Sequence, residues 1–307
     1  MAGKLAGSND LERLADLCNR TYKEQAVWFL NAFWDQFQAE AEKLWKHVQL
    51  CADLDAQRHA EGTALDELNA HRFLEQIGET LTVVALRERL RKTGAIGQTE
   101  RPKAVPLTHY ILWRYEVDWH VLVNSAGDNS AELNKAQALL DGVTAAFKES
   151  EKQAAYARLQ EAPFKAAQEE VDAALADVNA QESARDSRTA ELQRKSTEGG
   201  IVQQNKAKAE LAQHLAEDPL PLRKAKITLE AALKRAEKAR APFEAATRAA
   251  EAALDDARQK VEEAEAYLEE VKAKPGSPLG AIWWMETELE EQKKYLPSSK
   301  GGVAKRG

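Results

Sequence analysis

An unbroken alternation of four- and three-residue steps in the last third of the chain constrains the fold more than any other feature. The residues at 243, 247, 250, 254, 257, 261, 264, 268 and 271 are Phe, Thr, Ala, Leu, Ala, Val, Ala, Leu and Val. This spacing is typical of a helix whose seam packs against a second helix in a coiled coil. Because many seam residues are Ala, the partner helix can approach closely.

An earlier segment has the same rhythm and is the expected partner. Its apolar residues fall in two phases, which are Leu133, Ala136, Leu140, Val143 and Phe147, then Phe164, Ala167, Val171, Ala174 and Val178. Gly199 and Gly200 end this run, and Asp218 followed by Pro219 is typical of a new helix start. The sequence therefore predicts a long antiparallel hairpin. Since such a hairpin closes its own seam, we expect a monomer or a weak dimer.

The chain before residue 128 differs in composition and predicts a separate helical domain. It holds five of the seven Trp residues, at positions 28, 34, 45, 113 and 119. Apolar residues recur at helical spacing over 24–50, 64–92 and 107–124, with a loop over 95–106. We therefore predict an all-α chain with an N-terminal helical domain (1–128), an antiparallel coiled-coil hairpin rod (129–274) and a C-terminal tail (275–307).

The motifs that carry enzyme chemistry are missing from the sequence. It contains no GxGxxG, GxxxxGK[ST], HExxH or CxxC, and Cys18 and Cys51 lack the spacing of zinc ligands. The six His residues are scattered, and the rod carboxylates lack a cleft that would shift their pKa values. We expect no enzyme activity, no catalytic or metal site and no cofactor.

Charge and apolar content also restrict the partners and the compartment. The net charge of −7 argues against general nucleic-acid binding. No apolar run is long enough to span a membrane, and the first residues lack the apolar core of a secretory leader. Two cysteines without a disulfide framework favour a reducing compartment, so we expect a cytoplasmic protein.

The predicted rod has an uneven charge distribution. Residues 219–240 carry seven cations against two acids, a net charge of +5, whereas residues 241–271 carry −6. One interpretation is a solvated helix face with charge pairing inside the hairpin; the other is a basic end that docks an acidic polymer. A long rod with a basic end suits a filament cross-linker. The seven cations are Arg223, Lys224, Lys226, Lys234, Arg235, Lys238 and Arg240.

Both ends of the sequence resemble one family. QAVWFLNAFW (25–34) and GAIWWMETELEEQKKY (280–295) are similar to segments of the calcium-regulated 34-kDa actin-bundling proteins of social amoebae, and YILWRY (110–115) lies between them in the family's order. The resemblance implies a non-enzymatic protein that binds and bundles F-actin in the cytoplasm, at the cell cortex. It makes the seven cations candidate actin-binding residues and makes Trp283 and Trp284 a candidate tail anchor.

The resemblance also implies an EF-hand-like N-terminal domain, but the expected calcium loop does not fit. An EF-hand loop needs oxygen ligands at fixed steps, Gly at its sixth position and Glu at its twelfth. Residues 98–109 read QTERPKAVPLTH, with Lys103 sixth and His109 twelfth. An earlier loop, 53–64, has Arg58 sixth and Ala64 twelfth. We expect bundling to be insensitive to calcium; the alternative is an irregular calcium loop over 53–66 that uses Asp53, Asp55, Glu61 and Asp66.

Two other functions remain open from the sequence. The hairpin could serve a helical scaffold or adaptor that binds other protein partners, with membrane association like that of other curved coiled-coil modules. A helical enzyme or lipid carrier is the third hypothesis. Actin pelleting distinguishes the first function from the second.

Overall fold

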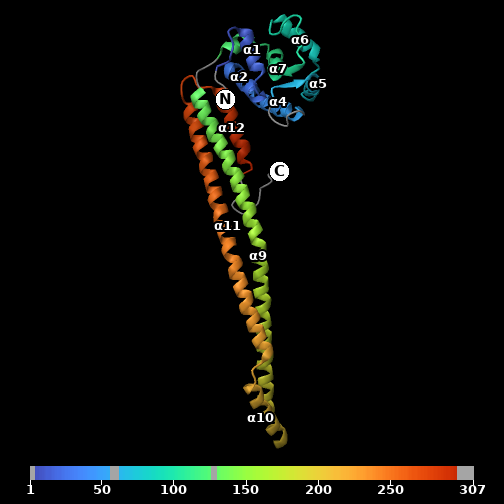
Figure 1. Cartoon of the computed structure of the whole chain (residues 1–307), viewed down its shortest axis with the longest axis vertical. Helices are drawn as coiled ribbons and strands as arrows, with labels where there is room; N and C mark the ends of the chain where they lie inside the picture. Colours follow the sequence, from blue (N-terminus) through green and yellow to red (C-terminus); the bar gives the residue numbers. More distant parts are fainter. Residues whose placement is uncertain (1–3, 56–61, 126–129, 296–307) are drawn as a thin grey trace. The chain divides into compact units, whose positions relative to one another are not determined.

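The computed structural model describes residues 4–55, 62–125 and 130–295, and within them the predicted all-α class is confirmed (Figure 1). The chain forms two compact units. The first contains the described residues up to 145 and those from 257 onward, and the second contains residues 146–256. Helices α9 (Ser130–Thr197) and α11 (Leu220–Lys272) each contribute residues to both units.

The second unit is part of an antiparallel hairpin. Glu170 on α9 pairs with Arg235 on α11, and Glu182 pairs with Lys226, so residue numbers fall on one helix as they rise on the other. Small side chains form the seam between the helices, as the spacing predicts. Its buried members are Ala167, Val171, Ala174, Ala232 and Ala236. The predicted antiparallel hairpin is confirmed.

The reversal of the hairpin contains a helix that the sequence analysis left within the connection. Helix α10 (Ile201–Ala216) follows Gly199, whose φ of +94° is left-handed and favours glycine. It runs back along α9, where His214 Nε2 lies 3.1 Å from Thr189 Oγ1 and Glu210 pairs with Arg188. The returning arm of the hairpin therefore consists of two helices, α10 followed by α11, with a break at 217–219.

Both long helices contain a proline at the same level of the seam. Pro163 lies inside α9 and Pro242 inside α11. The phenylalanine after each proline packs on the other, because the rings of Phe164 and Phe243 are stacked with centroids 5.1 Å apart and planes 7° apart. This pair continues the apolar seam through a level where each helix lacks one backbone N–H donor.

In the first unit, the segment predicted as one helix over 24–50 is divided. It forms α2 (Tyr22–Ala32), α3 (Trp34–Phe37), the 3-10 turn η1 (Gln38–Glu40) and α4 (Ala41–Leu54), after α1 (Asp10–Cys18). The bends allow aromatic rings of α2 and α3 to meet one residue of a later helix. Phe29 and Phe37 each have ring centroids 5.0 Å from that of Tyr115. Packing of large rings has overridden the helical period.

The predicted helix over 64–92 is also wrong, because it is a strand followed by two helices. These are β1 (Ala64–Asp66), α5 (Glu67–Gln76) and α6 (Val83–Lys92). Gly78 has a left-handed φ of +75° beyond the end of α5. Thr82 then caps α6, since its side chain accepts a hydrogen bond from Ala85 N.

The predicted helix over 107–124 is likewise two helices. They are α7 (Leu107–Tyr115) and α8 (Trp119–Asn124), separated at Glu116, whose φ is +53°. Strand β2 (Ala104–Pro106) precedes α7 and pairs antiparallel with β1, with Leu65 opposite Val105. Two helix–loop–helix segments, α4–α5 and α6–α7, are thus joined through their loops.

A buried glutamine holds these segments to α2. The Gln25 side-chain amide donates to the carbonyl oxygens of Arg20 and Thr63, each at 2.7 Å. Its Oε1 accepts from both the backbone N–H and the hydroxyl of Thr108, each at 2.8 Å. Both polar atoms of this side chain are therefore used, and they fix α2 to Thr63 before β1 and to Thr108 at the start of α7.

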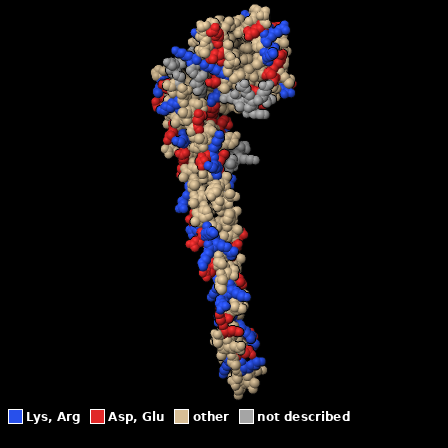
Figure 2. Space-filling view, viewed as in Figure 1, with Lys and Arg blue, Asp and Glu red and all other residues tan. Residues whose placement is uncertain are grey.

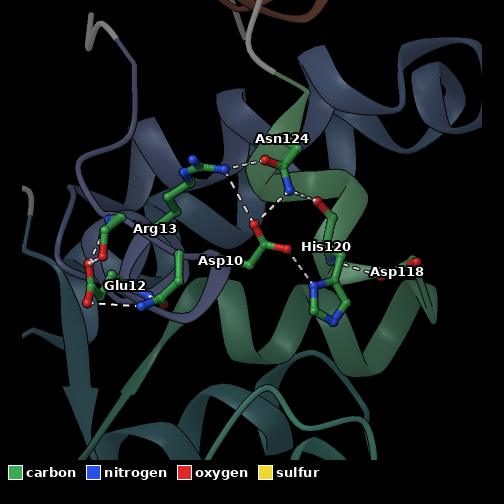
Figure 3. A network of polar contacts seen from close by, with 8 residues as sticks. Asp10, Glu12, Arg13, Asp118, His120 and Asn124 are labelled. Carbon is green, nitrogen blue, oxygen red and sulfur yellow. Dashed lines mark hydrogen bonds and ion pairs between the residues drawn. The ribbon is translucent and has the colours of Figure 1, made fainter.

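A polar network joins α1 to α8 at the surface of the first unit (Figure 3). One oxygen of Asp10 lies 2.7 Å from His120 Nδ1, and the other accepts from Asn124 Nδ2 at 2.9 Å. Arg13 donates to the Asn124 side-chain oxygen. The hydrogen bond from Asn124, with a further one from His120, lowers the pKa of Asp10.

Candidate functional site

The seven predicted cations lie on α11 in the second unit, and all are exposed. Figure 2 shows that Lys and Arg alternate with Asp and Glu in much of the visible surface, so the basic segment is not an uninterrupted patch. Five of the seven cations form ion pairs. These pairs are Arg223–Asp218, Lys226–Glu182, Lys234–Glu230, Arg235–Glu170 and Arg240–Glu244.

The ion pairs reduce the charge available to a partner. Two of them cross the hairpin to α9, and their N–O distances are 2.8 Å for Lys226 and 3.2 Å for Arg235. The hydrogen bond that Lys234 donates to Glu230 raises the pKa of Lys234, so this lysine stays charged. Lys224 and Lys238 form no ion pair with any residue that the structure describes, and they are the cations best placed to bind an external acid.

A shallow groove beside the basic segment brings in residues that the sequence analysis did not select. It has a volume of about 300 Å³, and its charged lining consists of three cations and two acids, around the apolar side chain of Ile227. The charged residues are Arg185, Arg223, Lys226, Asp218 and Glu230. Ile227 is 60% exposed, which is unusual for its type. Arg185 comes from α9, and no periodicity within α11 could have indicated it. The groove therefore has mixed charge around an exposed apolar side chain, with Arg223 already paired to Asp218.

The two tail tryptophans occupy different environments in the first unit. Both belong to α12 (Leu279–Lys293), where Trp284 is 1% exposed and packs on Trp45 of α4 with ring centroids 4.9 Å apart. Trp283 is half-buried, and its ring meets that of Trp284 edge-on. Trp284 therefore fixes α12 to α4, while Trp283 keeps part of its surface in solvent.

Helix α12 also crosses α2 at very short range. Asn31 Oδ1 accepts a 2.8 Å hydrogen bond from Ala281 N, one of the first N–H groups of α12, which has no partner within its own helix. Lys23 and Glu288 form an ion pair at 2.6 Å in which both side chains are mostly buried. These contacts make α12 part of the first unit.

The strand pairing tests the frames of the two predicted calcium loops. Val105 is the eighth residue of the 98–109 frame, and it pairs with Leu65. A twelve-residue frame in which Leu65 is also the eighth residue would begin at position 58 and end at Asn69. It starts five residues later than the predicted 53–64 frame. The 53–64 frame does not contain Leu65, so it is not the frame that this pairing aligns with 98–109. Residues 56–61, which include Glu61, lie outside the described residues.

Two of the three described acids of the predicted 53–66 loop already have other partners. Asp66 caps α5 by accepting from Asn69 N, and Asp55 accepts from the Tyr22 hydroxyl at 3.2 Å. Within residues 4–55, 62–125 and 130–295, no group of three or more His, Cys, Asp or Glu side chains could hold a metal ion. In the same part of the chain, no helix is both long and apolar enough to cross a membrane.

The twelfth residue of the second loop, His109, is chemically unsuited to a hard cation. It is 7% exposed, and burial, together with the charge of Arg87, lowers its pKa to about 4. The imidazole is therefore neutral at physiological pH, in the place where a calcium loop has a charged carboxylate with two oxygen ligands.

Comparison with known proteins gives a match to a family model in the rod and matches to solved structures. No curated protein matches the sequence. The crystal structure of the 34 kDa F-actin bundling protein from Dictyostelium discoideum matches with 20% identity and a TM-score of 0.47, covering 95% of this chain and 99% of that one. The family model described as F actin bundling C terminal matches residues 129–270, which span α9 and α10 and almost all of α11. Residues 129–270 of this chain are therefore similar to the F-actin bundling C-terminal family, the kind of protein that both ends of the sequence resemble.

Proposed function

We propose that this protein binds and bundles actin filaments. The observation that carries the proposal is the match of residues 129–270 to the F-actin bundling C-terminal family, because that stretch is the helical hairpin itself. The protein acts as a structural cross-linker without enzyme activity, in the cytoplasm at the actin-rich cortex. F-actin is its partner, and it has no nucleic-acid partner.

The basic segment of α11 contributes to actin binding mainly through its unpaired cations. Actin is acidic, and exposed charge pairs are individually weak and screened by salt, so several must act together. Lys224 and Lys238 are exposed and carry charge that no described acid neutralises. The paired cations Lys226 and Arg235 instead stabilise the hairpin register, and their reversal would place two acids together across the seam.

Co-sedimentation with F-actin tests this proposal. High-speed pelleting measures filament binding and low-speed pelleting measures bundling. Reversing both free cations, Lys224→Glu and Lys238→Glu, should weaken high-speed pelleting, with a larger loss at low salt because screening is then weaker. The matched control is Lys148→Glu with Arg248→Glu, which changes the net charge equally at two exposed positions of the same unit outside 219–240.

The result separates two errors. If the native chain does not pellet with filaments, actin binding is refuted. If the native chain pellets and both double variants lose the same amount, the interaction depends on total charge and the assignment to 219–240 is wrong.

We further propose that bundling does not respond to calcium and that the chain works as a monomer or weak dimer. The neutral, buried His109 and the capping role of Asp66 support the first point. The seam closed within one chain supports the second. Pelleting with and without micromolar calcium tests the first; loss of bundling on addition of calcium would overturn it.

A further inference from the structure

Helix α9 presents large apolar side chains to solvent within the second unit. Leu159 is 67% exposed, which is unusual for leucine, and Tyr156 is 49% exposed. At 3.6 residues per turn they share one face of the helix, about 120° wide, with four smaller apolar residues that are also exposed. These four are Ala155, Ala162, Pro163 and Ala166. Figure 2 shows uncharged surface part-way along the hairpin.

A charged residue stands at each end of this apolar face. Lys152 precedes the apolar residues, and Glu170 follows them eighteen residues later, which is about five turns and about 27 Å along the helix. Lys152 pairs with Glu149, and Glu170 pairs with Arg235, yet more than half of each of the two side chains stays exposed. The face over 152–170 is therefore basic at its start, apolar in the middle and acidic at its end.

This order of charges makes the face complementary to itself. A two-fold axis at residue 161, halfway between Lys152 and Glu170, would lay two copies of α9 antiparallel. Each lysine then faces the glutamate of the other copy, so both ends of the face gain an opposite charge. An acidic partner such as actin would instead be attracted at Lys152 and repelled at Glu170.

The same axis brings large side chains onto small ones. Residues at equal distances from position 161 face each other, so Leu159 lies over Pro163 of the second copy and Tyr156 over its Ala166. Because the interface is formed by the same surface of both chains, each of these contacts occurs twice. The face is therefore complementary to itself in shape as well as in charge.

We propose that the 152–170 face of α9 binds the same face of a second copy in an antiparallel dimer. The inference goes beyond filament binding and is tested on the protein alone. The seam of each hairpin stays closed within its own chain, since the contact uses only exposed residues. The association is weak, because Glu151 and Glu169, at the edge of the face, approach each other across the axis.

Cross-linking through one introduced cysteine tests the position of the axis. Identical residues of the two copies come closest at the axis and separate by about 3 Å for each residue away from it. A short bismaleimide should therefore join Ala162→Cys to itself in a covalent dimer. Ala184→Cys, at an exposed position of the same helix far from the axis, is the matched control and should stay monomeric. Equal cross-linking of the two variants would overturn the proposal.

The native cysteines do not compete in this experiment. Cys51 is buried, and burial raises the pKa of the Cys18 thiol to about 12, so little reactive thiolate forms. The chain without an added cysteine provides the blank.

Sedimentation equilibrium measures the association without a cross-linker. Leu159→Glu should raise the dissociation constant of the dimer at least tenfold, because two carboxylates would lose their water at the centre of the interface. Leu175→Glu is the matched control, since Leu175 is an exposed leucine of α9 outside this face, and it should leave the constant unchanged. Both changes are at exposed positions, and circular dichroism verifies that the helices are kept.

Two results would refute the dimer. One is a native protein that stays monomeric at about 10⁻³ M, and the other is an equal dissociation constant for the two leucine variants. If the native protein is monomeric and Leu159→Glu reduces pelleting with F-actin, the face belongs to the filament contact instead.

Discussion

Replacing Gly280 with alanine tests how closely α12 docks on α2. A Cβ at Gly280 would lie 2.6 Å from both the carbonyl carbon and the Cβ of Leu30, and 2.7 Å from Asn31 N. Nonbonded carbon atoms prefer about 3.5–4.0 Å, so the helices must separate by about 1 Å. Two of the three nearest atoms are backbone, so no side-chain rotation can relieve the contact.

The expected loss of stability is the sum of three effects. Overpacking costs about 1–3 kcal/mol. Separation of the helices also lengthens the bond from Ala281 N to Asn31, which contributes about 1 kcal/mol. The higher helix propensity of alanine returns somewhat less than about 1 kcal/mol. The net loss is about 1–3 kcal/mol, or about 2–12 °C at 2–4 °C per kcal/mol.

Thermal unfolding followed by tryptophan fluorescence measures this change, because Trp284 and Trp45 separate when α12 leaves α4. Gly142→Ala is the matched control, since the nearest atom to its added Cβ is Lys260 Cδ at 3.8 Å, an ordinary contact. That variant should keep or raise the melting temperature. A Gly280→Ala protein that melts within 1 °C of the native protein would refute the docking geometry.

Three further predictions concern pH and association. The lowered pKa of His109, about 4, means that its neutral form contributes stability above pH 6.5 that is lost as pH falls toward 4. In urea titrations, His109→Gln should therefore reduce the fall in unfolding free energy between pH 7 and pH 5 by about 2 kcal/mol. An unchanged fall would contradict the burial of the neutral ring. The lowered pKa of Asp10 likewise means that its bonds to Asn124 and His120 stabilise the fold above the ordinary pKa of Asp and are lost as pH falls below it. Asp10→Asn should therefore make the melting temperature fall less steeply with decreasing pH below about pH 4. A fall as steep as that of the native protein would count against this role. Light scattering should give the mass of a monomer or weak dimer, and an obligate dimer with an intermolecular seam would contradict the closed hairpin.

The rod could be predicted from sequence because its signal is local and repeated. Each turn of α11 places another small apolar residue on the same stripe, so single errors do not change the interpretation. The register was not accessible in this way. The pairing of Lys226 with Glu182 and of Arg235 with Glu170 depends on which levels of the two helices meet.

The first unit was harder to predict because its breaks are set by tertiary contacts and by single residues. Gly78 and Thr82 mark the interruption between α5 and α6, and attention to them could have corrected the predicted helix over 64–92. The bend after α2 has no such marker, since it follows from ring packing around Tyr115.

The paired prolines have a mechanical consequence for the proposed bundling of filaments. Pro163 and Pro242 leave the carbonyls of Leu159 and Lys238 without their usual helical donors at a common level. Local bending stiffness is lowest where both helices lack that bond, while the stacked rings of Phe164 and Phe243 resist sliding of one helix past the other. Load along the hairpin is therefore taken up by joint flexing at this level rather than by a change of register, which gives the cross-link elastic compliance at a defined point.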